Sequence, residues 1–127
     1  MCNERGRVLA HRTFSGCNCA FLGEDGFARL MADSAESLLA DAGINAADVA
    51  SAMFALTGYG EIPGTESSFP AALRAALPGC GQILIDNDSV AGWAGSLAAK
   101  PGINVVAGTG SVAYGRDPQR HGYRVGG

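Results

Sequence analysis

Helix-like and strand-like segments alternate along this chain of 127 residues, and the alternation constrains its fold more than any other feature. Apolar residues recur at spacings of three and four over 27–42, and related patterns at 69–77 and 88–99 predict two further helices. Short apolar runs at 50–58 and 82–86 predict strands that are covered on both faces of a parallel sheet. The order therefore predicts an α/β layer structure with a mostly parallel sheet.

The segments between and before these elements give further expectations. Arg7–Phe14 follows a Glu-Arg-Gly turn, and its β-branched and aromatic residues predict a strand after a hairpin turn whose first arm is almost absent. Residues 57–68 predict a long polar loop, either on the surface or on the ligand side, and Pro70 is expected in the first turn of the second helix. Lys100–Gly102 breaks the chain and predicts a domain boundary.

Composition and charge exclude several classes of partner. Nine Lys and Arg residues and a net charge of -3 provide no basic face, so we expect no nucleic-acid partner. The four cysteines lack metal-ligand spacing, so we expect free thiols and no metal site among them. The N-terminus has no apolar signal region, and no apolar run is long enough to span a membrane. We therefore expect a cytoplasmic protein with no membrane partner.

The stretch NVVAGTGSVAYG, residues 104–115, has a glycine spacing that fits several loops. A dinucleotide-binding loop must open a helix, and Pro118 leaves no room for one. A Walker loop needs Lys-Ser/Thr after the glycines, which is missing. What remains is a strand-turn-strand unit whose glycines let a phosphate approach the backbone N–H groups, or else a hairpin without a ligand. The residues of this turn are Gly108, Thr109, Gly110 and Ser111.

Two further polar segments are candidates for a site. Asp-Asn-Asp at 86–88 ends a buried strand directly before a helix, at the sheet edge where open α/β folds bind ligands. Asp88 is a candidate general base because a helix N-terminus favours an ionised carboxylate, while the alternative is that Asp88 or Asn87 simply caps the helix. Asn18 either forms an Asx turn, which the local sequence favours, or hydrogen-bonds a polyol.

Taken together, SGCNCAFLG, DND, INVVAGTGSVAYG and the closing YRVGG resemble the N-acetylglucosamine kinase and BadF/BadG/BcrA/BcrD-type ATPase group of the actin-like ATPase superfamily. The resemblance implies a ribonuclease-H-like domain that lacks its first strand, in residues 1–99, and the opening β-hairpin of a second such domain, in 103–127. It implies that ATP, Mg²⁺ and a sugar bind between the two domains. It also implies that Asp88 is the general base, that Asn18 and Asn87 contact the sugar, and that the glycine hairpin binds the ATP phosphates.

The family's first phosphate loop, of the Asp-Gly-Gly-Gly-Thr type, has no counterpart here, and the family's sequence continues beyond Gly127. We therefore expect a fragment of an ATP-dependent amino-sugar kinase, acting on a sugar like N-acetylglucosamine or glucosamine. One loop and one base do not supply the metal and charge neutralisation of phosphoryl transfer, so we expect the chain alone to be inactive. Unpaired sheet edges predict a homo-oligomer. The alternatives are a BadF-type ATPase that activates a radical dehydratase, and a non-catalytic ligand-binding or interaction module.

Overall fold

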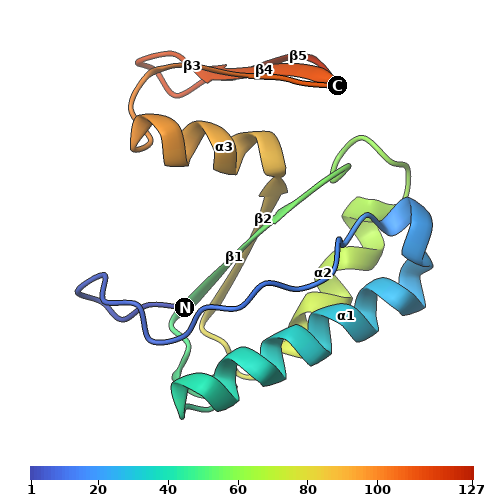
Figure 1. Cartoon of the computed structure of the whole chain (residues 1–127), viewed down its shortest axis with the longest axis vertical. Helices are drawn as coiled ribbons and strands as arrows, with labels where there is room; N and C mark the ends of the chain where they lie inside the picture. Colours follow the sequence, from blue (N-terminus) through green and yellow to red (C-terminus); the bar gives the residue numbers. More distant parts are fainter.

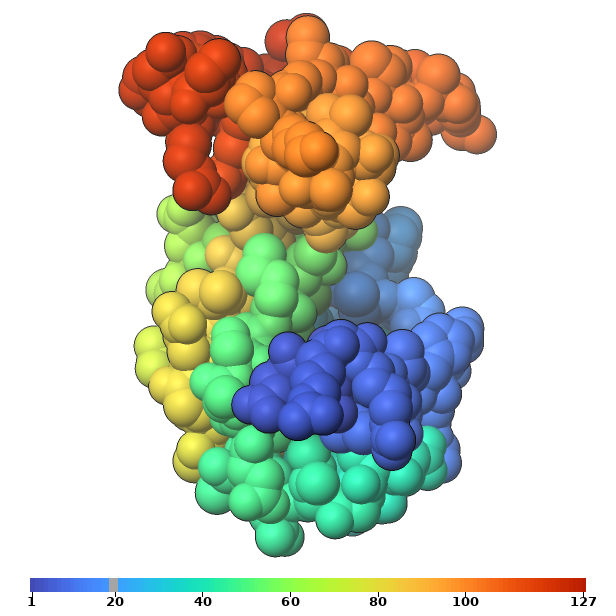
Figure 2. All heavy atoms as spheres, turned by 90° about the vertical axis from the view of Figure 1, so that its left-hand side faces the viewer, coloured from blue at the N-terminus to red at the C-terminus, as the bar shows by residue number. Residues whose placement is uncertain are grey.

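The computed structural model describes residues 1–127, apart from the side chains of residues 19 and 20. It contains a parallel pair of strands, β1 and β2, and a separate antiparallel sheet in the order β3-β4-β5. We call residues 1–87 the N-terminal unit and residues 88–127 the C-terminal unit. Figure 1 shows the two sheets at different levels of the molecule, and Figure 2 shows the C-terminal unit at one end. In the described part of the chain, no helix is both long and apolar enough to cross a membrane.

The first helix, α1 (Cys19–Ala42), confirms and extends the helix expected over 27–42. Gly23 interrupts it with a non-helical backbone (φ 65, ψ 175), which separates a short first segment from the amphipathic part. Gly43 ends it with a φ of 66, a left-handed conformation that glycine adopts without steric cost. The predicted periodicity therefore located the long segment and its end, but not its first turns.

The strands β1 (Ser51–Leu56) and β2 (Gln82–Asn87) are parallel, as expected, and pair from Ser51 opposite Gln82 to Leu56 opposite Asn87. The expectation that both faces are covered is wrong. Met53 is 50% exposed and its partner in register, Leu84, is 44% exposed. Side chains alternate between the faces of a strand, and the helices of the N-terminal unit cover only one of them.

The second helix, α2 (Thr65–Ala76), begins earlier than its proline suggested. Gly64 precedes it with a φ of 90, and the backbone amides of Ser67 and Ser68 both donate to the Gly64 carbonyl at 3.1 Å. Pro70 therefore lies inside the helix, beyond its first turn, and the end of the predicted 57–68 loop is helical. A 3₁₀ turn, η1 (Ala46–Asp48), joins α1 to β1.

The main core lies between these two helices and the covered face of β1 and β2. The rings of Phe27 and Phe69 stack with their centroids 4.1 Å apart, and this contact joins α1 to α2. Phe54, Ile83 and Ile85 pack against the same cluster from the strands. The buried side chains of this core are Phe27, Met31, Leu56, Phe69 and Leu73.

The N-terminal segment forms the expected turn but not the expected strand. Asn3 closes the turn, because its backbone amide donates to the Arg7 carbonyl at 3.0 Å. A single antiparallel bridge between Cys2 and Val8 follows, and the rest of 7–14 is extended without strand pairing. A strand requires a partner backbone in register, which propensity alone does not provide. The strand predicted over Arg7–Phe14 is therefore wrong.

The C-terminal unit packs one helix against one sheet. It consists of α3 (Asp88–Leu97), β3 (Gly102–Ala107), β4 (Ser111–Arg116) and β5 (Gly122–Gly126). Val90 and Trp93 of α3 are buried against Tyr114 of β4, with the indole and phenol rings edge to face at 6.0 Å. The hairpin of β3 and β4 confirms the predicted strand-turn-strand unit, whereas β5 was not predicted.

Candidate functional site

The junction of β2 and α3 carries the predicted Asp-Asn-Asp run. Asn87 is the N-cap of α3: its Oδ1 accepts the Ser89 backbone N–H at 3.1 Å and the Ser89 hydroxyl at 2.7 Å. Its Nδ2 donates to the Tyr59 carbonyl at 3.2 Å and to Oε1 of Glu61 at 2.5 Å. Asn87 is only 8% exposed. The amide of Asn87 is thus already satisfied by protein groups.

Asp88 is the first residue of α3 and is exposed. Its Oδ2 accepts a hydrogen bond from the Thr57 hydroxyl at 2.7 Å, and Thr57 directly follows β1. The other carboxylate oxygen has no hydrogen-bond partner within the described part of the chain. The helix N-terminus stabilises a negative charge at this position. Asp88 is therefore a carboxylate with one oxygen held and one open to solvent.

The glycine hairpin is an exposed turn between β3 and β4, whose last ladder pair is Ala107 and Ser111. The Gly108 N–H donates to the Gly110 carbonyl at 2.9 Å. Neither glycine has a positive φ, and a Cβ added at Gly110 would meet no atom within 4 Å. A Cβ at Gly108 would meet only the Gly110 carbonyl oxygen, at 3.8 Å. Neither backbone conformation nor crowding requires glycine here, so the space over the turn is open.

The same turn carries hydrogen-bond donors without partners. Across the described residues, the backbone amides of Thr109 and Gly110 donate to no other group. The hydroxyls of Thr109 and Ser111 likewise have no partner there. Backbone amides grouped in a turn attract anions, and hydroxyls add further donors. The residues present therefore fit a phosphate group.

The hairpin turn and Asp88 lie at the same end of the C-terminal unit. A Cβ at Gly102 would lie 2.9 Å from Leu97, at the end of α3, and Asn104 accepts a hydrogen bond from Ser96 at 3.1 Å. β3 thus runs back along α3 toward its first residue, as Figure 1 shows. A ten-residue helix is roughly 15 Å long and a six-residue strand roughly 20 Å. The turn therefore lies beyond the N-terminus of α3, on the Asp88 side.

Asn18 lies at the start of α1, and its backbone carbonyl accepts the amides of Phe21 and Leu22 at 3.1 and 3.2 Å. Cys17 packs against the main core together with Tyr59 from the loop that follows β1. Figure 1 shows the start of α1 beside this loop, near the carboxyl end of β1. Asn18 is thus at the same edge of the sheet as the loop that holds Asp88.

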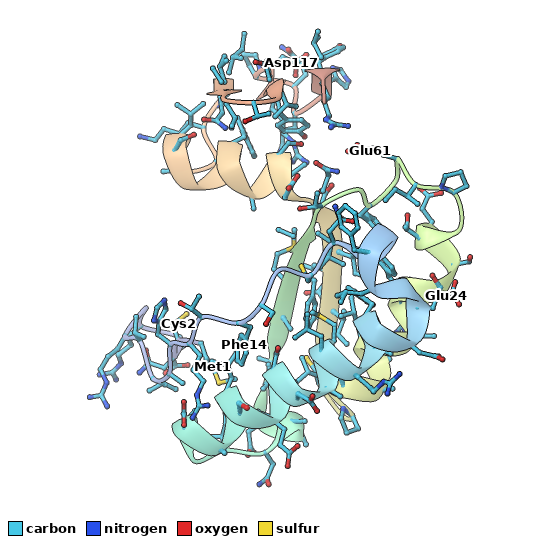
Figure 3. The ribbon with its side chains drawn as sticks, turned by 45° about the vertical axis from the view of Figure 1, so that its right-hand side comes forward. Met1, Cys2, Phe14, Glu24, Glu61 and Asp117 are labelled. Carbon is cyan, nitrogen blue, oxygen red and sulfur yellow. The ribbon has the colours of Figure 1, made fainter. Side chains whose placement is uncertain are left out.

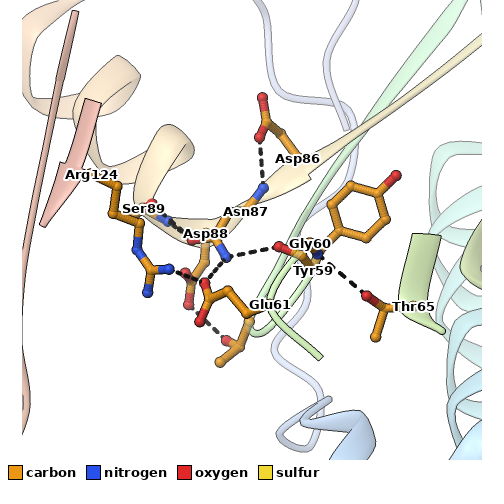
Figure 4. Close-up of polar contacts among 10 residues, drawn as sticks. Tyr59, Gly60, Glu61, Thr65, Asp86, Asn87, Asp88, Ser89 and Arg124 are labelled. Carbon is orange, nitrogen blue, oxygen red and sulfur yellow. Dashed lines mark hydrogen bonds and ion pairs between the residues drawn. The ribbon is translucent and has the colours of Figure 1, made fainter. Parts of the chain in front are cut away.

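Three residues of this region were not among the predicted site residues, and Figure 4 labels two of them, Glu61 and Arg124, near the β2–α3 junction. Thr57 holds Asp88, Glu61 holds Asn87, and Arg124 of β5 forms an ion pair with Glu61. The partners are 26 or more residues apart in the chain. No local pattern marks such contacts, because they arise only when the strands and helices have been placed.

The described residues contain no group of three or more His, Cys, Asp or Glu side chains positioned to hold a metal ion. Mg²⁺ is usually bound by one or two carboxylates together with water and substrate phosphates. Asp88, at the N-terminus of α3, does not make such a site by itself.

The comparisons with known proteins concern the family and the fold of the chain. The model of the BadF/BadG/BcrA/BcrD ATPase family matches residues 1–127. A solved structure from Chromobacterium violaceum, described as a putative N-acetylglucosamine kinase, superposes with a TM-score of 0.69 at 22% identity over 98% of this chain. The chain spans 42% of the length of that protein. No curated protein matches the chain. At 22% identity the solved structure shows that the two proteins share an α/β fold. Because the family model matches the whole sequence, the chain belongs to the BadF/BadG/BcrA/BcrD ATPase family.

Proposed function

We propose that the chain forms part of the nucleotide and substrate cleft of an ATP-dependent kinase that phosphorylates a hydroxyl of an amino sugar. Membership of an ATPase family supports the use of ATP. The amino sugar is suggested by the description of the structural neighbour as an N-acetylglucosamine kinase. Because the chain spans 42% of that neighbour, the residues described here account for part of such a cleft.

The open glycine turn carries this proposal. A side chain is unfavourable at a glycine position where it would strain the backbone or collide with a neighbour, and neither applies at Gly108 or Gly110. The open space at both positions leaves room for a group that approaches the turn from outside. Unpartnered amides and hydroxyls at the same turn favour an anion, and the ATP phosphates are the anions that a kinase binds.

Asp88 is the base in this proposal. Its open oxygen accepts the proton of the sugar hydroxyl, while the Thr57 hydroxyl holds the other oxygen at 2.7 Å and limits rotation of the carboxylate. ATP, when bound, would supply the terminal phosphoryl group to the sugar oxygen, with ADP as the leaving group. Asn18 contributes a contact to the sugar from the start of α1. Positioning of the reacting groups is the main contribution that a protein makes to this chemistry.

The proposal is tested by measuring ATP binding after a single methyl group is added at Gly110. Gly110→Ala fills the space that a phosphate would occupy and leaves the fold intact, since the added Cβ meets nothing within 4 Å. Gly95→Ala in α3 is the matched control, because a Cβ there also meets nothing within 4 Å. Isothermal titration calorimetry with ATP should show that Gly110→Ala weakens binding at least about tenfold. Equal affinity of the two variants, or no binding by the unmodified chain, contradicts the proposal.

A further inference from the structure

One oxygen of Glu61 contacts both units of the molecule. Its Oε1 accepts a hydrogen bond from Nδ2 of Asn87 at 2.5 Å and pairs with Nη1 of Arg124. Figure 3 shows Glu61 on the loop that follows β1, on the side facing the C-terminal unit. The side chains of Arg124 and Glu61 are 29% and 36% exposed, so solvent screens their attraction and the pair adds little stability. Its consequence is geometric: Glu61 connects β5 with the β2–α3 junction.

The side-chain amide of Asn87, which Glu61 contacts, caps the start of α3. Asn87 is buried, and Oδ1 of its amide accepts the Ser89 amide while Nδ2 donates to Glu61 and Tyr59. The amide plane is thus fixed from both ends. An N-cap residue orients the first turn of its helix, and Asp88 is the first residue of that turn. A change in the Glu61 contact therefore reaches Asp88 through Asn87.

The same loop holds Asp88 directly. The Thr57 hydroxyl donates to Oδ2 of Asp88 at 2.7 Å, four residues before Glu61. Two consecutive residues, Asn87 and Asp88, are therefore held by one short segment of the loop, as Figure 4 shows. The position of this segment decides the direction in which the Asp88 carboxylate points.

Arg124 connects this arrangement to the glycine hairpin. It lies opposite Tyr114 in the β4–β5 register, and Tyr114 packs against Trp93 of α3. Residues directly opposite in an antiparallel pair point to the same face of the sheet, so Arg124 shares the face that packs against α3. The β3–β4 turn belongs to the same three-stranded sheet. A contact that holds Arg124 therefore also holds the sheet that carries the turn.

We propose that Glu61 is a positioning residue, which through Asn87 and Arg124 fixes Asp88 and the Gly108–Ser111 turn relative to each other. This assignment rests on the proposed function for its significance, since it places the base opposite the phosphate loop. The geometry itself does not depend on a bound nucleotide. Glu61 needs no contact with substrate in this role, because it acts through the residues that it holds.

The cap contact is tested by hydrogen exchange of the Ser89 backbone amide, followed by NMR on the whole nucleotide-free chain. Glu61→Ala should raise the Ser89 exchange rate about fivefold to tenfold, because the cap loses the contact that orients it. Glu61→Gln keeps an acceptor for Asn87 and should leave the rate close to that of the unmodified chain. Glu36→Ala, an exposed glutamate of α1, is the control and should change nothing. An unchanged Ser89 rate in Glu61→Ala overturns the proposal.

The connection to the sheet is tested by residual dipolar couplings, also without nucleotide. In the unmodified chain, amides of the N-terminal and C-terminal units should fit one common alignment tensor. Arg124→Gln, a change at the surface that leaves both cores intact, should change the relative orientation of the units and worsen the fit to one common tensor, and Arg124→Lys, which retains the charge, should restore that fit. A common tensor in Arg124→Gln overturns the proposal, as does its absence in the unmodified chain. Because neither measurement uses ATP, these results are independent of whether the hairpin binds nucleotide.

Discussion

The two sheets of the molecule bury their side chains to different extents. The β1–β2 pair has two helices on one face, and the rings of Phe27 and Phe69 join those helices in the main core. The β3–β4–β5 sheet has only α3 on one face, with Trp93 and Tyr114 as its largest buried side chains. The first arrangement has the larger buried cluster, and the second has a smaller one centred on the contact between Trp93 and Tyr114.

The outward face of the second sheet makes the difference clearer. Ile103 and Tyr123 flank Gly115 in register, and Val105 and Val125 flank Ala113 in the same way. The four larger side chains are between 63% and 73% exposed. Small residues on β4 between larger ones on β3 and β5 leave an open apolar cavity of about 340 Å³. The same sheet thus has one packed face and one accessible apolar face.

The largest expected effect is the loss of a ring from the main core. Phe27→Ala removes the ring stacked on Phe69, and the free energy of unfolding should fall by about 3–5 kcal/mol. Phe21→Ala is the matched control in the same helix, because Phe21 is 88% exposed, and its effect should stay within about 0.5 kcal/mol. Urea denaturation followed by circular dichroism measures both. Similar losses for the two variants would show that α1 does not pack as described.

Substitution of one tyrosine on each face of the second sheet compares how tightly the two faces are packed. Tyr114→Ala removes the partner of Trp93, where Tyr114 is 8% exposed, and should cost about 3 kcal/mol. Tyr123→Ala removes a side chain that is 63% exposed and should cost below about 1 kcal/mol. Because Trp93 is the one tryptophan of the sequence, its fluorescence should shift to longer wavelength in the first variant only. Equal costs would mean that the face toward α3 is no more packed than the outward face.

The smallest effect concerns the N-terminal segment, which Arg12 ties to Asp41 at the end of α1. The hydrogen bond from Arg12, together with its positive charge, lowers the pKa of Asp41 below the ordinary value of 3.8, against a smaller opposing effect of desolvation. A lowered carboxylate pKa stabilises the fold above the unfolded-state value, and this stabilisation is lost as pH falls through the folded-state value. Arg12→Gln should therefore lower the melting temperature slightly at pH 7, and the difference should vanish in acid well below pH 3.8. A difference that grows on acidification would contradict this sign.

Sequence reasoning placed the elements whose patterns are local. The 3.6-residue period over 27–42, the apolar runs of β1 and β2, and the glycine turn of the β3–β4 hairpin were all predicted and are present. It failed where an element depends on a partner. Residues 7–14 have strand-like composition but form only an isolated bridge at Val8 with a few backbone hydrogen bonds around it, whereas 122–126 contains two glycines and forms β5 because β4 lies beside it.

The residues of the candidate site also fall into those suggested by local sequence and those that depend on distant contacts. Asp88, Asn18 and the glycine turn were singled out as candidates from short motifs, and their roles stay predictions. The capping role of Asn87 was one of two alternatives, and the structure decided it through contacts with Ser89. Glu61 lies in the loop predicted over 57–68 and Arg124 in the closing YRVGG segment, but nothing in either segment predicts that these two side chains pair with each other. Long-range contacts of this kind become visible only in the folded chain.

The central claim is that the hairpin turn and the start of α3 form one phosphate-facing site. An ATP titration followed by ¹H–¹⁵N NMR tests it most directly, with adenosine as the comparison ligand that lacks phosphates. We predict that ATP shifts the amides of Gly108–Ser111 most, shifts those of Asp88 and Ser89 as well, and that adenosine leaves the turn unchanged. Unchanged amides at Gly108–Ser111 in saturating ATP, or the same shifts with adenosine, would contradict the account.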